Sequence, residues 1–346
     1  MKPRTRFLSR LFLLLCCIFA AAPALASAAG IAMHVIDVGQ GDSIFVQFPN
    51  GSTMLVDAGP SDAGPTVVRY LKDLGVRKID ILVLTHPHSD HLGGMADVLD
   101  AFEIGKVWDS GYQHGSGLQR RFLETIAKRK IRFGRPKAGF SERVGAAVVD
   151  VLAPVREISG TKGDVNNNCL VLRVSYGRFT ALLMADAERE ERASVGTFPQ
   201  SAVLKVSHHG SHNGTDAAFL RQVRPEAAVI TCAAENDYGH PHKAAVQALE
   251  RAGVAWRSTA NAGPVVIASD GRELFLKTGT YRPEPKPTSA PAPAAGTVGG
   301  YIGNSRSKVF HLPTCEGLPD EKKQVRFDDR DDAIRAGYKP CGRCNP

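Results

Sequence analysis

The densest group of residues that could do chemistry lies in the string THPHSDHLGG. It holds four side chains that can bind metal ions, and it follows the apolar run 79–84 directly. That run is short, β-branched and bounded by polar residues, which predicts a buried strand. Imidazole and carboxylate ligands together suit zinc, with manganese or iron as alternatives. We expect His86 and His88 to bind one ion, and Asp90 and His91 to serve a second. The competing interpretation is a polar strand-to-helix loop.

Further ligands are expected where later strands end. Asp186 closes the apolar run 179–186, where its carboxylate could bridge two cations or cap the next helix. A second run, 202–206, is followed by the pair His208 and His209. Adjacent residues of an extended chain point to opposite sides, so we expect only one of the pair to bind. The spacing favours His208, with His209 supporting it or binding in its place.

Two other residues are candidates for contact with a substrate. Lys205 lies inside a predicted strand, where an unpaired charge is costly. It is therefore expected either to pair with an acid or to point at a phosphate. His240 lies in a loop before the predicted helix 243–253, where it could donate a proton or contact a phosphate. A helix-capping histidine is the alternative.

The chain has 346 residues, of which 43% are hydrophobic. This suits one large domain with a small module. Residues 1–26 read as a signal peptide, because four basic residues precede a short apolar stretch and a small-residue cleavage site. An uncleaved anchor and a lipoprotein are the alternatives. We expect an exported protein, extracellular or periplasmic, without stable membrane insertion after cleavage. The net charge of +8 falls by four without this segment, so charge alone argues weakly for nucleic acid.

Strand and helix patterns alternate after the signal. Residues 31–58 predict three short strands, residues 64–74 an amphipathic helix, and residues 91–102 a second helix. This alternation favours an α/β domain built in layers. We expect a hydrolase domain over residues 27–280.

The remainder of the chain has a different composition. Residues 281–299 are rich in Pro and Ala and predict a linker. Residues 300–346 hold an HxxxC pair and a CxxC pair, which are typical of a structural zinc site. The four expected ligands are His311, Cys315, Cys341 and Cys344. A module this small needs such support. A disulfide with a spare thiol is the alternative.

The HxHxDH string resembles the signature of the metallo-β-lactamase fold. The resemblance implies an αββα sandwich and two divalent ions, zinc or manganese. It also implies that Asp57 steadies the histidine loop. Most two-metal members carry a further histidine where this chain has Asn168. The first ion would then have His86, His88 and Asp186, with Asn168 as an uncertain ligand.

Four other strings are more specific. DVGQGD, NNCLVL, LKVSHHGS and YGHP resemble the extracytoplasmic domain of the ComEC family of DNA-uptake proteins. This resemblance implies DNA as the substrate. The tail resembles the small zinc domain of Ada, a DNA repair protein whose first ligand is a methyl-accepting cysteine. That position is His311 here, so methyl acceptance is not expected.

Together these features predict a nuclease in which two ions acidify a water for attack on phosphorus. Asp90, Lys205 and His240 are the catalytic candidates. A hydrolase of a lactam, lactone, thioester or small phosphoester is the alternative, as is a DNA-binding protein without catalysis. The sequence indicates no protein partner.

Overall fold

The computed structural model describes residues 30–278, 300–313, 315, 317–327, 333–334 and 336–341. The chain divides into two compact units, residues 1–283 and 284–346. The predicted signal and linker lie outside the described residues. Within the described ranges, no helix is both long and apolar enough to cross a membrane.

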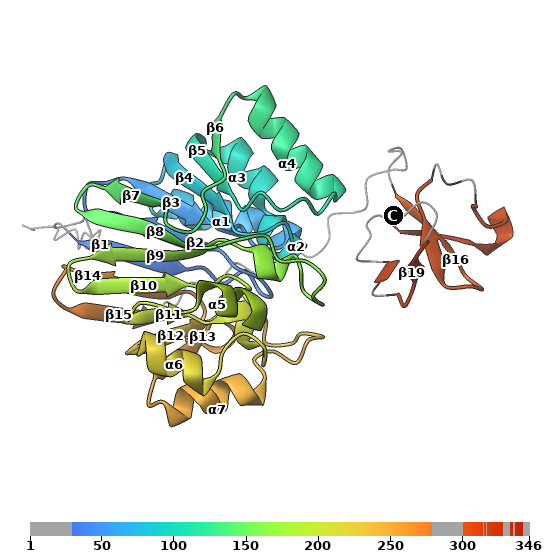
Figure 1. Ribbon diagram of the computed structural model, residues 1–346. Helices are drawn as coiled ribbons and strands as arrows, with labels where there is room; N and C mark the ends of the chain where they lie inside the picture. Colours follow the sequence, from blue (N-terminus) through green and yellow to red (C-terminus); the bar gives the residue numbers. More distant parts are fainter. Residues whose placement is uncertain are drawn as a thin grey trace, which may run out of the picture. The chain divides into compact units, whose positions relative to one another are not determined.

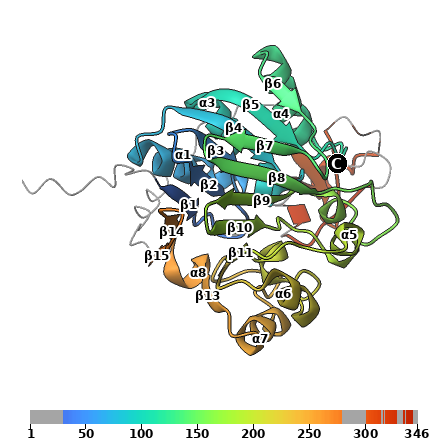
Figure 2. The same cartoon turned by 60° about the vertical axis from the view of Figure 1, so that its left-hand side comes forward.

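The first unit contains two large sheets that face each other (Figures 1 and 2). The eight-stranded sheet has the spatial order β15 (Leu274–Thr278), β14 (Val265–Ser269), β1 (Ile31–Val35), β2 (Ile44–Gln47), β3 (Thr53–Val56), β4 (Lys78–Leu84), β5 (Glu103–Asp109) and β6 (Arg132–Gly134). The pairs from β3 to β6 are parallel and the others antiparallel.

The second sheet is built in a similar way. Its seven strands have the order β13 (Ala255–Ser258), β12 (Ala227–Ile230), β11 (Val203–Lys205), β10 (Phe179–Leu183), β9 (Val171–Tyr176), β8 (Ala147–Ala153) and β7 (Ser141–Val144). The pairs from β10 to β13 are parallel. Each sheet therefore has one parallel half, whose strands end at a common edge.

Helices cover the outer faces of both sheets. On the first sheet they are α1 (Gly64–Asp73), α2 (Ser89–Leu92), α3 (Met95–Ala101) and α4 (Gly117–Lys128), and on the second α5 (Arg189–Val195), α6 (Ala217–Val223), α7 (Lys243–Arg251) and α8 (Thr259–Ala262). In Figure 1, α4 lies at the top of the first unit, and α6 and α7 lie below the strands. This is the four-layered αββα sandwich expected from the sequence.

Apolar side chains fill three spaces between these layers. One cluster, with Phe48, Phe179 and Trp108, lies between the two sheets. A second lies between the first sheet and its helices, and a third between the second sheet and its helices. Cys169 and Cys232 are fully buried in the third. Because both sheets are fixed on two faces, the strand ends that carry the polar residues are held rigidly.

The predicted helix over residues 91–102 is broken in the structure into α2 and α3. The break falls at Gly93 and Gly94, where the chain passes close to the loop that follows β3. A Cβ at Gly93 would meet the backbone of Pro60, and one at Gly94 would meet the carbonyl oxygen of Ala58. These two glycines therefore allow the histidine loop to lie directly against the end of β3.

The second unit is a small four-stranded sheet. Its strands have the order β18 (Gln324–Phe327), β16 (Tyr301–Asn304), β17 (Val309–His311) and β19 (Lys339–Pro340). Phe310, Ala333 and Tyr338 form its buried centre. So few apolar side chains bury little surface, which is why a unit of this size needs additional cross-links.

Candidate metal centre

The expected ligands meet where the parallel strands of both sheets end. His86 and His88 follow β4, and Asp186 follows β10. One imidazole nitrogen from each histidine and a carboxylate oxygen of Asp186 lie within 4.8 Å of one another. His86 Nε2 lies 3.1 Å from His88 Nδ1 and 3.8 Å from Asp186 Oδ2. This is the first of two ligand groups.

The second group contains Asp90, His91, Asp186 and His209. Asp186 Oδ2 lies 3.4 Å from His91 Nε2 and 3.5 Å from His209 Nε2. Asp90 Oδ2 lies 3.1 Å from His209 Nε2. Asp186 is thus a member of both groups, as expected for a carboxylate that bridges two ions. It does not cap α5, whose N-cap residue is Glu188.

Unpaired atoms in the site fit a bound cation. His91 Nε2 and Asp186 Oδ1 are buried and make no hydrogen bond. Buried polar atoms without a partner are rare in folded proteins, and each needs a reason. Nitrogen and oxygen ligands of this kind suit zinc or manganese. The donor set therefore fits two divalent ions that share Asp186.

The charges of the site fit the same interpretation. Burial alone would raise the pKa of Asp186, but His209 and His91 hold that pKa well below its usual range. Burial would lower the pKa of His209, yet Asp186 and Asp90 raise it to about 9. In the absence of ions, protonated histidines supply the positive charge that the carboxylates need. Ion binding must therefore release protons.

Residues behind the ligands fix the orientation of two rings. Asp57 Oδ2 accepts a hydrogen bond from His91 Nδ1 at 2.7 Å, and Asp57 also bonds both the backbone and the hydroxyl of Thr85. His209 Nδ1 donates to the carbonyl oxygen of Thr231 at 2.9 Å. Such partners fix the tautomer and aim the remaining nitrogen at the ion. Asp57 thus occupies the orienting position expected for it, whereas Thr85 and Thr231 were not anticipated from the sequence.

The structure brings His209, rather than the expected His208, into the second group. Strand β11 ends at Lys205, and both histidines then adopt left-handed backbone conformations, with φ of 49° and 52°. The chain is therefore not extended here, and strict alternation of side chains does not apply. His208 is 22% exposed and its Nδ1 lies 3.3 Å from Glu188 Oε1. Its Nε2 remains 3.7 Å from Asp186 Oδ2, so it lies at the margin of the site.

We expect His209→Ala to lower metal affinity by more than about 100-fold, because loss of a supporting partner alone costs 10–100-fold. His208→Ala should cost less than about tenfold, since His208 only flanks Asp186. The measurement is metal content after dialysis against a chelator of fixed concentration. The reverse order would assign the ligand to His208.

Lys205 does not point toward a substrate. It is fully buried, and its Nζ lies 2.5 Å from Asp42 Oδ2. Of the two roles expected for it, pairing with an acid is therefore the one that the structure shows. Asp42 also accepts a hydrogen bond from Thr231 and lies behind His209. The sequence signal for this acid was the DVGQGD string, whose last residue is Asp42.

Asn168 is not placed to bind an ion. Its side-chain nitrogen donates to the carbonyl oxygens of Ile158 and Asp164, at 2.7 and 2.6 Å. Its side-chain oxygen accepts from the Ile158 amide at 2.9 Å. All of these contacts are to backbone groups, so Asn168 holds the 158–164 loop in place. The first ligand group consequently has three protein members.

His240 reaches the site as a neighbouring ring. Its centroid lies 5.5 Å from that of His208 and 6.0 Å from that of His209. Burial, together with the charges of His209 and His208, lowers the pKa of His240 to about 4.

Two hollows flank the ligand groups. One, of about 370 Å³, is lined by Ser110, Gly111, Tyr112, Gln113, Lys137, Glu157 and Asn168. His114, which follows the lining residue Gln113 in the chain, has its ring 5.8 Å from that of His88. The other, of about 530 Å³, includes His240 and lies on the side of the second group.

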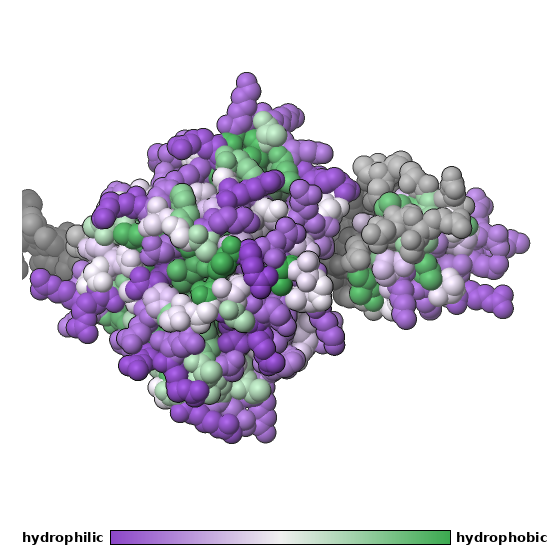
Figure 3. Space-filling model, viewed as in Figure 1, coloured by the Kyte–Doolittle hydropathy of each residue, from purple (hydrophilic) through white to green (hydrophobic). Residues whose placement is uncertain are grey.

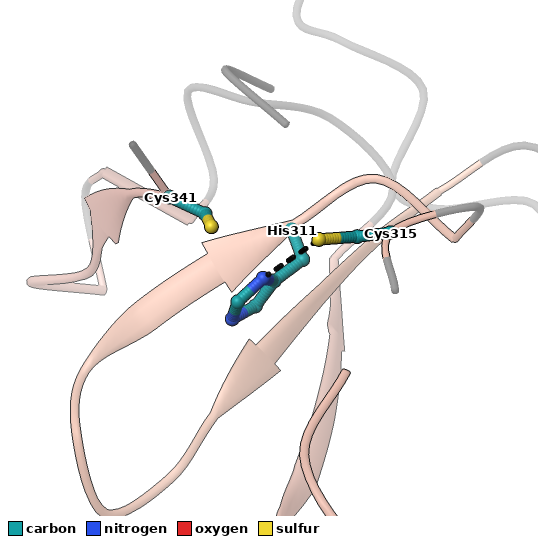
Figure 4. A group of neighbouring side chains, drawn as sticks. All are labelled: His311, Cys315 and Cys341. Carbon is teal, nitrogen blue, oxygen red and sulfur yellow. Dashed lines mark hydrogen bonds between the residues drawn. The ribbon is translucent and has the colours of Figure 1, made fainter. Parts of the chain in front are cut away.

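The small second unit has a ligand group of its own. His311, Cys315 and Cys341 bring one ligand atom each within 4.8 Å of one another (Figure 4). His311 Nδ1 lies 3.4 Å from Cys315 Sγ. His311 and Cys315 are buried, and sulfur with imidazole is the ligand set of structural zinc. The fourth expected ligand, Cys344, lies outside the described residues.

Comparison with known proteins agrees with the two-part division. Residues 36–234 match the family described as "Metallo-beta-lactamase superfamily", and residues 299–346 match "Metal binding domain of Ada". The crystal structure of the metallo-beta-lactamase fold protein YhfI from Bacillus subtilis is similar to 70% of this chain and to 100% of that chain, with a TM-score of 0.50 and 13% identity. That likeness shows a shared fold.

Two curated relatives each match about two thirds of this chain. The chain is 30% identical over 240 residues to "ComE operon protein 3" of Bacillus subtilis, covering 63% of this chain and 30% of that protein. It is 30% identical over 242 residues to "Recombination protein 2" of Haemophilus influenzae, covering 68% of this chain and 28% of that protein. The chain thus spans less than a third of these relatives.

These matches confirm both resemblances inferred from the sequence. The superfamily match covers more than half of the chain and contains both ligand groups up to His209. The chain therefore belongs to the metallo-beta-lactamase superfamily, as a hydrolase related to competence proteins and joined to an Ada-like metal-binding domain.

Proposed function

We propose that the chain is an exported, metal-dependent phosphodiesterase that cuts DNA. The observation that carries this proposal is the pair of ligand groups that share Asp186 at the common edge of two sheets. Two ions in such a site activate a water nucleophile and stabilise the charge that develops on a phosphoryl group. The choice of DNA is supported by the competence proteins among the relatives.

The residues of the chain have separate tasks in this proposal. Asp90 and Asp186 supply the negative charge that holds the ions. Asp57 keeps His91 in one tautomer, and Thr231 does the same for His209. The buried Lys205–Asp42 pair connects β11 to the loop before β2 and supports the second group from behind.

The substrate backbone is proposed to enter beside the first ligand group. The hollow there includes the exposed Lys137, whose Nζ donates to the carbonyl oxygen of Ser110 at 3.1 Å. A lysine held beside a metal site is suited to contact a phosphate. Asn168 and the polar backbone of Gly111 complete this side of the hollow.

Lys137→Gln should raise KM for DNA and leave kcat near the wild-type value, because the contact holds the substrate equally before and during reaction. It should also reduce the slope of log affinity against log salt by about 1, the amount expected for one lost phosphate contact. Lys72→Gln, at the far end of α1, is the matched control. An unchanged slope for Lys137→Gln would remove this residue from the substrate path.

The tail is proposed to bind one zinc and to act as a tethered second contact for DNA. Its mixed charges predict modest, salt-sensitive binding. Comparing the full chain with a chain that ends at residue 285 tests this role. DNA affinity that is the same in both chains at low salt would exclude it.

The function itself is tested with the metal-loaded mature protein. Supercoiled plasmid, linear duplex, single-stranded DNA and nitrocefin are incubated with zinc or manganese, and again with EDTA. We expect DNA to be cut, EDTA to stop cutting, and nitrocefin to remain intact. DNA that is bound but never cut would indicate a binding protein, and hydrolysis of nitrocefin alone would indicate a lactam-type substrate. Sequencing the N-terminus of the exported product tests the signal peptide.

A further inference from the structure

An exposed aromatic ring lies beside the second ligand group. Tyr238 is 65% exposed, more than any other large apolar side chain in the part of the chain that the structure describes. It lies in the loop between β12 and α7. The face of the first unit drawn in Figure 3 is mostly hydrophilic, with small apolar areas, which is usual for a soluble surface. An aromatic side chain this exposed beside a metal site needs a specific reason.

The Tyr238 ring is connected to the ligands through other rings. It lies nearly parallel to the His240 ring, at an angle of 18° with 5.6 Å between centroids. His240 is buried, and its ring lies 6.0 Å from that of His209 in the second ligand group. Three rings therefore lead from the protein surface to the ligands.

The loop that carries Tyr238 is held in one conformation by Asn236. The Asn236 side-chain nitrogen donates to the carbonyl oxygens of Ala233 and His240, at 3.0 and 2.8 Å. Its side-chain oxygen accepts from the backbone amides of Tyr238 and His240, at 3.2 and 2.9 Å. Gln40 also contacts the His240 ring at 3.3 Å. A ring that is fixed before binding loses little entropy when a ligand stacks on it.

The charges around this loop indicate which part of a ligand would bind. The adjoining hollow of about 530 Å³ is lined by Ala234, Glu235, Asn236, Asp237, Gly239 and His240. Glu235 and Asp237 are exposed carboxylates, and no lysine or arginine is among the lining residues. Such a surface repels phosphate and suits an uncharged ring with amino groups. The cationic Lys137 lines the other hollow instead.

We propose that Tyr238 is a stacking platform for a nucleobase of the substrate strand, on the side of the second ligand group. This rests on the proposed DNA phosphodiesterase function. Every base has a π face, so stacking binds single strands with little sequence preference. Asn236 acts through the loop as the positioning residue.

The test compares full-length, metal-loaded wild type with Tyr238→Ala and Tyr238→Phe. The substrates are a single-stranded oligonucleotide and the same backbone made abasic throughout. Wild type should prefer the base-bearing strand. Tyr238→Ala should lower that preference about tenfold or more, since loss of one base stack has an effect of this size. Tyr238→Phe should keep the preference, because it retains the ring. Phe275→Ala, which removes another exposed aromatic ring, is the matched control and should also keep it.

An unchanged preference in Tyr238→Ala would overturn the proposal, as would a loss in Tyr238→Phe equal to that in Tyr238→Ala. Failure of the proposed DNA-cutting function would be recognised separately, because the wild-type protein would then cut neither strand. In that case, fluorescence anisotropy with the two strands in EDTA decides the stacking role. Equal binding of base-bearing and abasic strands by wild type would overturn it.

Discussion

Asp186→Ala should abolish hydrolysis and remove both ions, while the fold survives. Asp186 is the single residue common to the two ligand groups, so its loss leaves each group one carboxylate short. Loss of a residue that only supports a metal ligand already lowers metal affinity or activity about 10–100-fold. Because Asp186 is itself a candidate ligand, we expect activity to fall by more than about 100-fold, to background. The measurements are turnover, bound metal by elemental analysis, and circular dichroism for the fold.

Asp73→Ala, which removes an exposed carboxylate at the end of α1, serves as the control and should behave as wild type. If purified Asp186→Ala keeps wild-type turnover, the two groups do not act as one centre. If it loses only one ion and keeps activity, the first or second group alone carries the chemistry.

Lys205→Met should destabilise the metal-free protein by about 3–5 kcal/mol, the usual cost of leaving one member of a buried ion pair alone. Lys205 is fully buried, and the substitution leaves the buried Asp42 carboxyl group without its 2.5 Å partner. The double variant Asp42→Leu/Lys205→Met should recover most of this loss, because it removes both charges. The free energy of unfolding is measured by denaturant titration in EDTA, so that ion binding does not contribute.

A matched comparison is available in the pair formed by Lys106 and Glu142, which is partly exposed. Lys106→Met should cost no more than about 1 kcal/mol, because water screens the unpaired glutamate. Equal losses of unfolding free energy for Lys205→Met and Lys106→Met would mean that burial does not determine how much the Lys205–Asp42 pair contributes to stability. A double variant as unstable as Lys205→Met would point to packing rather than charge.

Short, strongly patterned segments were predicted well from the sequence. The run 79–84 became β4, the residues 64–74 became α1, and three short strands formed between residues 31 and 58. The candidate ligands His86, His88 and Asp186 follow from the same reasoning, since each comes within a few residues of the end of a buried strand. The end of a strand fixes where the next side chains lie. Residues predicted there from their chemistry are therefore also found close together in the structure.

The site departs from the sequence expectation where the backbone leaves regular structure. The spacing after the strand favoured His208 over His209, but both residues have positive φ, so the chain turns where it was expected to stay extended. Asp57 and Ala185, beside other ligands, also have positive φ, which is uncommon for residues other than glycine. Local propensity disfavours these conformations, and only the packing of both sheets imposes them.

The partners of Lys205 and Asn168 could not be predicted from the sequence for a different reason. They depend on which segments of the chain meet in the fold. Lys205 pairs with a carboxylate 163 positions earlier in the chain, at Asp42. Asn168 bonds the backbone of a nearby loop whose path no periodic pattern predicts. A single sequence shows that a buried charge needs a partner, but it does not show which partner.

The second ligand group joins residues that are far apart along the chain, since Asp90 and His209 are separated by 119 positions. Contacts of such long range form late in folding, because a large loop must close first. An ion therefore finds its complete ligand set only after the two halves of the sandwich have docked. Its binding energy then acts mainly on the native state and slows unfolding, with little effect on the rate of folding.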